Sequence, residues 1–358
     1  MSMPHNTEQV MTFAEAINDA MVEAMASDDK VFCYGLGVDD PKRIFGTTNN
    51  LKERFGSNRV FDVPTAENAL MGIGVGAALG GYRPVFVNQR FDFILLAMDQ
   101  IVNAAAKWRY MFGGQNKVPM VLRAVVGRGW GQGPTHSQCL HSWLAHIPGL
   151  KVVMPTSPRD AKGLLLSSIF DDNPVIFIEH RWLHNTSGVV PPDDYRVPLG
   201  EAELIREGSD LTIVATSYMN VEAVHALEHL ECQGISADLI DLRCVRPIDW
   251  EKISLSVKKT GRLLVLDIGA GAVSVASEIV SKMSTDNWSD LKAAPVKICM
   301  PDKAQPTSPA LTKGFYPDAS TIVRNISALV GKELEWESLS AKQSWPHDVP
   351  GTWFNGPF

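Results

Sequence analysis

The sequence predicts an α/β fold in two domains, the first a parallel sheet covered by helices and the second a smaller α/β domain. Helical and strand patterns alternate along most of the 358 residues. The predicted strands are continuous apolar runs, which is typical of parallel strands buried on both faces. The alternation stops between His184 and Arg196, where Pro191 and Pro192 precede two aspartates. Such a segment is typical of a linker between domains.

The first domain is predicted at residues 1–190. A capping box formed by Thr12 and Glu15 begins its first amphipathic helix. Further helices are expected at Glu67–Gly80, at about Phe91–Met111 and at Ala161–Phe170, with strands at Val31–Tyr34, near Val60, and at Pro84–Val87, Val118–Arg123, Lys151–Met154 and Val175–Ile178.

The second domain is predicted at residues 209–331, after a linker at 191–208. Residues 332–358 form a tail rich in aromatic residues and prolines, which predicts that the tail packs on another surface. That surface is expected to be a partner subunit, and the alternative is the second domain itself. The predicted strands are Asp210–Thr216, Ala237–Ile240 and Arg262–Asp267, the helices are Val221–Gln233 and Asp249–Lys258, and the tail aromatics are Trp336, Trp345, Trp353, Phe354 and Phe358.

Composition narrows the class of protein. A formal charge of -7 without a long basic run argues against nucleic acid or an anionic membrane as partner, because phosphate binding needs clustered Lys and Arg. The five cysteines are widely spaced and include no Cys-x-x-Cys pair, which favours a reducing cytoplasm over a zinc site or a disulfide framework. Met1–Val10 is polar, and no run of about 18 apolar residues occurs. Neither a signal peptide nor a membrane span is expected.

The predicted helix that begins at Glu67 is rich in small residues. Gly72, Gly74 and Gly76 form a Gly-x-Gly-x-Gly run, but a dinucleotide fingerprint has its glycines in the turn before the helix, not inside it. Close helix packing is therefore the preferred interpretation. Glu67 itself is a candidate general acid, since a carboxyl withdrawn from water keeps its proton more readily. A purely electrostatic role at the helix N-terminus remains open.

Three histidines, His136, His141 and His146, follow a glycine-rich loop at intervals of five residues. Five residues turn about 140° around a helix, so the three cannot share one face as a metal site. A loop that delivers His136 to a pocket is the better interpretation. The sequence contains no Ser/His/Asp order, P-loop or His-Glu-x-x-His motif.

Several short segments carry a more specific signal, in nearly collinear order from residue 11 to about 330. They are Pro64–Glu67, Asp99–Asn103 with Ala106–Lys107, His136–Gln138, Pro148–Val153, Asp160–Leu164, Asp241–Arg243 and the ending from Ser308–Pro309 to Pro317–Asp318. Together they resemble the β subunit of the first, decarboxylating component of 2-oxo acid dehydrogenase complexes of the pyruvate or branched-chain type. The resemblance implies a transketolase-like pyrimidine-binding domain followed by a transketolase C-terminal-type domain.

The resemblance implies thiamine diphosphate as cofactor. Glu67 would hydrogen-bond a ring nitrogen of its aminopyrimidine and favour the imino tautomer that removes the proton from the thiazolium carbon. Phe93 would stack on the pyrimidine, and Gln89 would line the same pocket. His136 would stabilise charge near the reacting carbon during decarboxylation and acyl transfer.

The family also implies a structural potassium ion bound by main-chain oxygens. A hard cation with oxygen ligands would suit the turn Asp171–Pro174. The matching positions are Met120, Ser168, Ile169, Asp171 and Asn173.

A missing motif points to a partner. Thiamine enzymes hold Mg²⁺ and the diphosphate with a motif that begins Gly-Asp-Gly, and this chain contains no such triplet. An α subunit would therefore supply the Mg²⁺ site, in the α₂β₂ heterotetramer that the family implies. Such an enzyme decarboxylates a small 2-oxo acid and passes the acyl group to a lipoyl acyltransferase core.

One segment and one single residue depart from the family pattern. Asp267–Gly271 replaces a Glu-Glu-Gly segment, and Arg90 stands where a neutral residue is commoner. Both changes can alter the substrate or the docking of the acyltransferase. The sequence does not identify the 2-oxo acid or the acyl acceptor.

Two other functions compete with this one. The C-terminal half of a split transketolase would share the glutamate and also lack Gly-Asp-Gly, but His136–Gln138 and Asp99–Lys107 favour the dehydrogenase. A non-catalytic regulatory paralogue is the other alternative. The presence of Glu67, Phe93 and His136 together argues against it.

Overall fold

The computed structural model describes residues 9–192, 194–342, 344–354 and 356, which form two compact units. The first unit comprises the described residues up to Val126 and the segment Trp143–Leu199. The second comprises the loop Gly127–Ser142 and the described residues from Gly200 onward. Residues 1–190, expected to be one domain, therefore include a loop that packs with the second unit.

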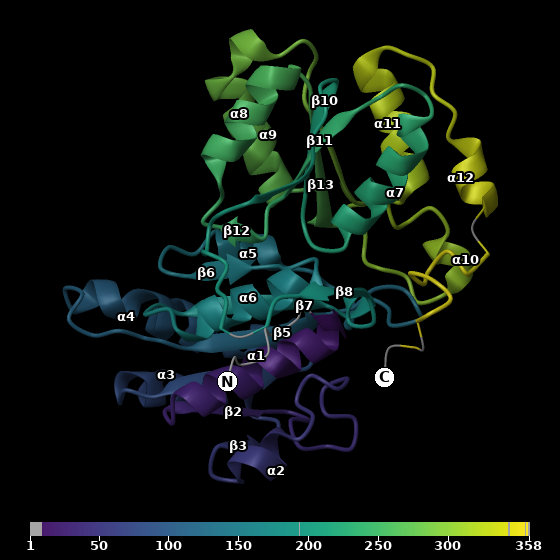
Figure 1. Ribbon diagram of the computed structural model, residues 1–358. Helices are drawn as coiled ribbons and strands as arrows, with labels where there is room; N and C mark the ends of the chain where they lie inside the picture. The colour runs from purple at the N-terminus through teal and green to yellow at the C-terminus, as the bar shows by residue number, and fades with distance from the viewer. Residues whose placement is uncertain (1–8, 193, 343, 355, 357–358) are drawn as a thin grey trace, which may run out of the picture. The chain divides into compact units, whose positions relative to one another are not determined.

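A parallel sheet forms the centre of the first unit, with its strands in the order β6-β7-β5-β4-β2-β3 (Figure 1). Neighbouring strands are parallel and mostly buried, which confirms the interpretation of the apolar runs. A short antiparallel pair, β1 with β8, is separate from this sheet. The strands are β1 (Gln9–Thr12), β2 (Val31–Gly35), β3 (Val60–Asp62), β4 (Arg83–Asn88), β5 (Val121–Val126), β6 (Lys151–Val153), β7 (Val175–His180) and β8 (Ser187–Val190).

Helices cover both faces of this sheet. The first helix begins at the predicted capping box, where Glu15 N–H donates to Thr12 Oγ1 at 3.2 Å and Thr12 N–H donates to the Glu15 carboxylate at 2.8 Å. In the sheet order, the step from β3 to β4 runs in one direction and the step from β6 to β7 runs in the other. Crossovers between parallel strands are right-handed, so the helices of these two connections, α3 and α6, lie on opposite faces of the sheet. α1 packs against α6. The helices of this unit are α1 (Phe13–Ser27), α2 (Leu51–Phe55), α3 (Glu67–Leu79), α6 (Pro158–Ile169) and the 3₁₀ turn η3 (Arg181–Leu183), while α5 (His141–Ala145) includes residues of both units.

The segment predicted as one helix from about Phe91 to Met111 consists of three helical pieces, so that prediction was wrong. The buried side chains of Phe91, Ile94 and Ala97 recur at every third residue, and a helix with three residues per turn keeps them on one face. A regular α-helix would rotate part of this face away from the core. The pieces are the 3₁₀ helix η1 (Phe91–Ala97), the π-helix η2 (Gln100–Ala105) and α4 (Ala106–Met111).

The second unit has its own sheet, in the order β14-β13-β10-β11-β9, with only the β11-β9 pair antiparallel. The crossover through α7 advances in one direction and those through α8 and α9 in the other, so α7 and α11 cover one face and α8 and α9 the opposite face (Figure 1). β9 lies inside the expected linker 191–208. The elements are β9 (Glu203–Arg206), β10 (Leu211–Ala215), α7 (Met219–Glu231), β11 (Ala237–Asp241), β12 (Cys244–Arg246), α8 (Trp250–Thr260), β13 (Leu263–Ala270), α9 (Val275–Asp286), η4 (Trp288–Asp290), β14 (Val296–Met300), α10 (Pro309–Thr312), α11 (Ala319–Val330) and α12 (Glu337–Lys342).

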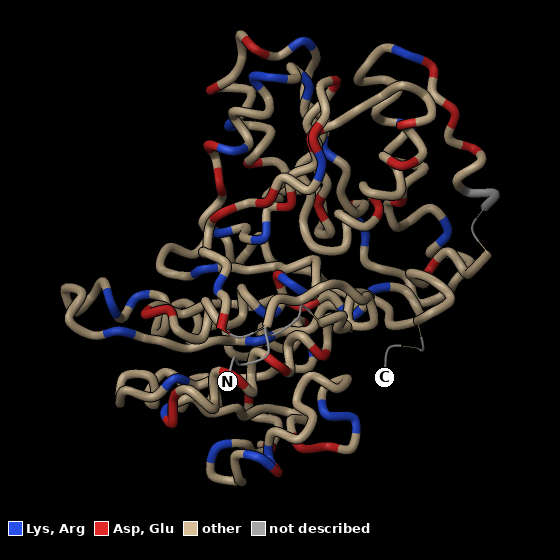
Figure 2. Tube along the Cα trace, in the orientation of Figure 1, with Lys and Arg blue, Asp and Glu red and all other residues tan. Residues whose placement is uncertain are grey.

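Charged residues are distributed along the whole chain. Figure 2 shows Lys and Arg interspersed with Asp and Glu in both units, without one long basic tract. None of the helices in the part of the chain that the structure describes is both long and apolar enough to cross a membrane.

The tail after Gly331 packs on the second unit itself. Glu335 O lies 2.6 Å from His229 Nε2 and accepts a hydrogen bond from Gln233 Nε2 at 2.9 Å, which ties the tail to α7. Further along, the buried Phe354 ring meets the Trp130 ring edge-on, with 5.5 Å between ring centroids. These contacts agree with the alternative, in which the tail folds over its own domain, and not with the first expectation, in which it packs on a partner subunit. Phe358 lies outside the described residues.

We expect Phe354→Ala to lower the free energy of unfolding by roughly 3–5 kcal/mol, the usual cost of deleting a buried aromatic side chain. Denaturant unfolding of the purified chain, followed by circular dichroism, measures this change. Trp288→Ala is the control, since that ring is 75% exposed and its loss should change the stability by less than about 0.5 kcal/mol. Equal stability of the two variants would show that the tail is not held by Phe354.

Candidate functional site

Three of the predicted site residues meet at one edge of the first sheet. A crossover helix begins near the carboxyl ends of the parallel strands, so the start of α3 and the end of β4 share an edge. Glu67 is the first residue of α3, Gln89 follows β4 directly, and Phe93 lies in η1, which packs on α3. Ligands of open α/β sheets bind outside the carboxyl ends of the strands. The structure therefore places Glu67, Gln89 and Phe93 where such a fold binds small molecules.

Glu67 is buried at the N-terminus of α3, with 6% of its surface exposed. Ala66 at the N-cap position gives no side-chain hydrogen bond to the helix, and the N-terminal end of the helix dipole favours a negative charge there. Within the described residues, no hydrogen bond or ion pair links the Glu67 carboxyl to another side chain or to the backbone. A carboxyl in this position can hydrogen-bond a ring nitrogen of a bound heterocycle.

Of the three glycines in the α3 run, Gly74 serves close packing as the sequence predicts, whereas a Cβ atom at Gly76 would have no neighbour within 4 Å. A Cβ atom at Gly74 would lie 2.2 Å from Tyr34 Oη and 3.1 Å from Met120 Cε, so a larger residue would clash. Tyr34 Oη also donates to Leu70 O at 2.9 Å, which fixes the helix on β2. These contacts hold the helix close to the sheet and so determine the position of Glu67.

Other polar and aromatic side chains lie at the same edge of the sheet as Glu67. Gln89 Nε2 donates to Leu36 O at 3.2 Å, and Phe93 is half-buried. Sequence reasoning missed Asn88, which is wholly buried at the end of β4 and whose side-chain nitrogen and oxygen have no hydrogen-bond partner among the described residues. Buried amides normally have partners, so Asn88 is a further candidate for contact with a ligand or bound water. The sequence feature that could have indicated Asn88 is a polar residue directly after the apolar run Pro84–Val87.

A fully buried ion pair lies between β5 and β7. Arg123 Nε and Nη2 donate to the two carboxylate oxygens of Glu179 at 2.6 and 3.0 Å, and neither side chain is exposed. Burial alone would raise the pKa of Glu179, but Arg123 and His184 outweigh it and lower the pKa to about 2. The pair is thus ionised at neutral pH and joins two adjacent strands of the sheet.

The five positions of the implied potassium site lie around the turn between α6 and β7 and at the start of β5. Arg83 Nη1 already donates to two of the carbonyl oxygens, Ile169 O at 3.0 Å and Asp171 O at 3.1 Å. Met120 O accepts from Val175 N–H, and the Asp171 carboxylate binds Lys151. Two of the five implied main-chain oxygens thus bind a guanidinium, and the nearby Asp171 carboxylate binds an ammonium, so in this arrangement those groups are engaged by side chains and not free for a potassium ion.

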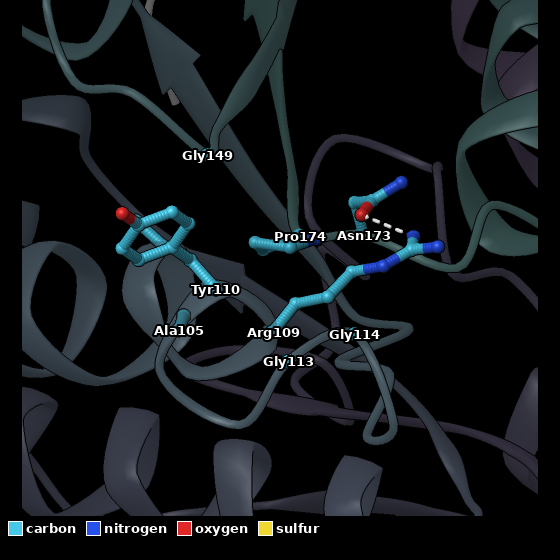
Figure 3. Close-up of a pocket in the computed structure, with 9 residues that line it drawn as sticks. Ala105, Arg109, Tyr110, Gly113, Gly114, Gly149, Asn173 and Pro174 are labelled. Carbon is cyan, nitrogen blue, oxygen red and sulfur yellow. Dashed lines mark hydrogen bonds between the residues drawn. The ribbon is translucent and has the colours of Figure 1, made fainter.

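A cavity of about 460 Å³ lies elsewhere in the first unit and contains none of the candidate catalytic residues. In Figure 3 the Tyr110 ring and Pro174 face it, and Arg109 Nη1 donates to Asn173 Oδ1 at 2.7 Å. That hydrogen bond also engages Asn173, one of the five potassium positions. The cavity is lined by Ala105, Ala106, Arg109, Tyr110, Gly113, Gly114, Gly149, Asn173 and Pro174.

His136 lies on the loop Gly127–Ser142, hereafter the His136 loop, which belongs to the second unit. Its Nδ1 is 3.1 Å from Thr135 Oγ1. At the start of the loop, the Arg128 guanidinium lies between the rings of Tyr218 and Tyr316, 4.9 and 5.0 Å from their centroids. Gly129 N–H also donates to Tyr316 Oη at 2.8 Å. The loop is therefore attached firmly to the second unit just before it reaches His136.

The three histidines of the five-residue pattern have separate surroundings. His141 is wholly buried beside Asp267, whereas His146 belongs to the first unit. No group of three or more His, Cys, Asp or Glu in the described ranges has an arrangement that could hold a metal ion. The role of His136 as a residue that its loop presents to a pocket stays a prediction.

Comparison with known families assigns both halves of the chain. Residues 9–186 match the family described as Transketolase, pyrimidine binding domain, and residues 200–322 match Transketolase, C-terminal domain. Among solved structures, an inactive β₄ tetramer of a split-gene transketolase superposes with a TM-score of 0.71 at 21% identity, covering 90% of this chain and 99% of that one. At this identity the likeness shows the fold alone.

Three relatives are far more similar in sequence. The pyruvate dehydrogenase E1 component subunit beta of Rhizobium meliloti is 40% identical over 92% of this chain and 72% of that protein. The 2-oxoisovalerate dehydrogenase subunit beta of Bacillus subtilis is 41% identical over 86% of this chain and 94% of its own length. A subunit beta of an acetoin:2,6-dichlorophenolindophenol oxidoreductase from Cupriavidus necator is 39% identical, with the same two coverages.

Glu179→Gln should lower the free energy of unfolding by roughly 3–5 kcal/mol at neutral pH, because it leaves the Arg123 charge buried without its counter-ion. The folded-state pKa of Glu179 is depressed, so its stabilisation is present above its ordinary pKa near 4.5 and is lost as the pH falls toward 2. The difference between the two proteins should therefore shrink between pH 5 and pH 2. Denaturant titrations across that range measure it. Glu228→Gln, in an exposed pair with Arg206, should cost less than about 1 kcal/mol at every pH.

Proposed function

Because the chain belongs to the family of β subunits of the first component of 2-oxo acid dehydrogenase complexes, we propose a cofactor site on its first unit. In this proposal, the edge of the first sheet at which Glu67 lies binds the pyrimidine half of thiamine diphosphate. The family depends on this cofactor, which supplies the carbanion chemistry of decarboxylation when bound. The observation that carries the proposal is the buried Glu67 carboxyl at the N-terminus of α3, beside the end of β4 and unbonded to any other described residue.

Each candidate residue has a role in this proposal. Glu67 exchanges a proton with a pyrimidine ring nitrogen, and Phe93 offers its half-buried ring for stacking. Gln89, held by Leu36, lines the same edge. His136 stabilises negative charge on the reacting 2-oxo acid and on the acyl group as it leaves.

The proposal includes an α subunit as partner. The sequence contains no Gly-Asp-Gly triplet to hold Mg²⁺ and a diphosphate, so the partner would supply that half of the site. The similar proteins from Rhizobium meliloti and Bacillus subtilis are themselves named as beta subunits. We propose an α₂β₂ heterotetramer that decarboxylates pyruvate or a similar 2-oxo acid and passes the acyl group to a lipoyl acyltransferase.

The competing functions are less well supported. The split transketolase shares the fold at 21% identity, whereas the dehydrogenase β subunits reach about 40% over most of the chain. A non-catalytic paralogue would not need a buried carboxyl at the position of Glu67, and that carboxyl is present. A potassium requirement is not part of the proposal, because Arg83 and Lys151 already contact the oxygens of that turn.

Glu67→Gln should reduce turnover of the enzyme reconstituted with its α subunit by at least on the order of 10²-fold, since an amide cannot exchange the proton that general acid-base catalysis requires. Steady-state kinetics measure the loss, and sedimentation checks that the complex still assembles. Glu251→Gln is the matched control, because Glu251 is an exposed glutamate in the first turn of another helix, α8. An assembled Glu67→Gln enzyme with most of its activity would rule out the role of Glu67.

The isolated β chain should bind thiamine diphosphate weakly, because it contributes the pyrimidine contacts without a diphosphate motif. Titration calorimetry with Mg²⁺ present measures the affinity for the chain alone and for the reconstituted complex. We expect saturable, tight binding only for the complex. Tight, Mg²⁺-dependent binding to the lone chain would contradict the proposed division of the cofactor between two subunits.

A further inference from the structure

A chain of buried polar groups holds the end of the His136 loop. Cys139 Sγ lies 3.1 Å from His141 Nδ1, and His141 Nε2 lies 3.0 Å from Asp267 Oδ1. Asp267 also accepts hydrogen bonds from Gly269 N–H at 2.8 Å and Ala276 N–H at 3.2 Å. The His141 and Asp267 side chains are at most 1% exposed. The loop is thereby joined to the carboxyl end of β13 and to the start of α9.

The His141–Asp267 contact is an ion pair. Burial alone would lower the pKa of His141, but Asp267 and Cys139 outweigh it and raise the pKa well above its ordinary value of 6.5. Burial would raise the pKa of Asp267, whereas His141 and the two backbone N–H groups bring it below its ordinary value. At neutral pH both imidazole nitrogens are protonated, so Nε2–H donates to Asp267 and Nδ1–H points to Cys139.

The shape of the site requires a glycine at position 269. A Cβ atom there would lie 2.8 Å from His141 Cε1 and 3.2 Å from Cys139 O. Asp267 provides the charge and Gly269 provides the space for the same imidazole. Asp267 and Gly269, both in the segment that departs from the implied pattern, thus contact the same side chain, His141.

The other end of the loop is fixed independently. Arg128 is held between Tyr218 and Tyr316, and Gly129 is bonded to Tyr316, as described above. Near the middle, a Cβ atom at Gly133 would lie 2.3 Å from Thr307 Oγ1, so the loop also passes very close to the segment that precedes α10. His136 stands between these attachments, five residues before His141.

We propose that the His141–Asp267 ion pair is a positioning device that fixes the His136 loop and so holds the His136 imidazole in its productive place. The inference rests on the proposed function, in which His136 acts on the substrate. A catalytic group must be placed within a fraction of an ångström, and a regular element gives such precision more readily than a loop does. The buried pair gives this loop a rigid attachment.

The order thiol, imidazole, carboxylate also occurs where a cysteine acts as a nucleophile. Cys139 is buried, however, which favours a role in attaching the loop over nucleophilic attack.

Asp267→Asn tests the proposal in the reconstituted enzyme, because the amide keeps the shape of the side chain and removes the charge that binds the imidazolium. Asp238→Asn is the matched control. Asp238 is an equally buried aspartate in the same sheet, paired with Lys259 at 2.6 Å, and it contacts Ser256 rather than the loop. The readouts are kcat and KM, the melting temperature, and hydrogen exchange of residues 127–142 in the β chain.

We expect Asp267→Asn to lower kcat on the order of 10²-fold, the loss that a misplacement of about 1 Å can cause, with KM changed less than about twofold. Hydrogen exchange in the loop should become faster. Asp238→Asn should lower the melting temperature without either effect. Gly269→Ala, which displaces His141 by steric contact and leaves every charge in place, should reproduce the loss of kcat and the faster exchange.

Two results would overturn the proposal: a normal kcat in Asp267→Asn, or an equal loss of kcat in Asp238→Asn. Should Asp267→Asn not fold, Gly269→Ala decides the question by the same measurements. His136→Ala separates this proposal from the proposed function. Full activity of His136→Ala would refute the role of His136, while faster exchange in Asp267→Asn would still show that the ion pair holds the loop.

Discussion

The ion pair of Arg123 and Glu179 is the interaction on which the first unit depends most. It joins β5 to β7 in the interior of the sheet, and both charges are fully withdrawn from water. Each charge needs the other, because a lone guanidinium or carboxylate in that place would be destabilising by several kcal/mol. The two strands lead directly to the His136 loop and to η3. The pair therefore joins the two strands close to the point where these segments leave the sheet.

The proposed catalytic groups are held in two different ways. Glu67 begins a helix that packs closely on the sheet through Gly74 and Tyr34, so regular structure alone sets its position. His136 lies on a loop without regular structure, and such a loop needs attachments at both ends. Arg128 between two tyrosine rings provides one, and the buried pair of His141 and Asp267 provides the other. Secondary structure fixes one group, and buried charges fix the other.

The segment Asp267–Gly271, which departs from the pattern that the resemblance implies, makes contacts that the structure explains locally. Asp267 binds His141 by charge, and Gly269 leaves the space that the imidazole needs. At the turn after α6, Arg83 binds the carbonyl oxygens of Ile169 and Asp171, and Lys151 binds the Asp171 carboxylate.

The sequence by itself determined the two-domain α/β class and the position of Glu67 at the start of its helix. Those features follow from apolar runs, caps and short segments, which are local and can be detected in a linear sequence. It did not determine the break of Phe91–Met111 into three helical pieces, because a three-residue and a four-residue spacing of apolar side chains differ only once the core they face is known. The pairing of His141 with Asp267 and the packing of the tail were decided by the tertiary structure. Both join residues far apart in the chain, and only folding brings their charges and rings within contact distance.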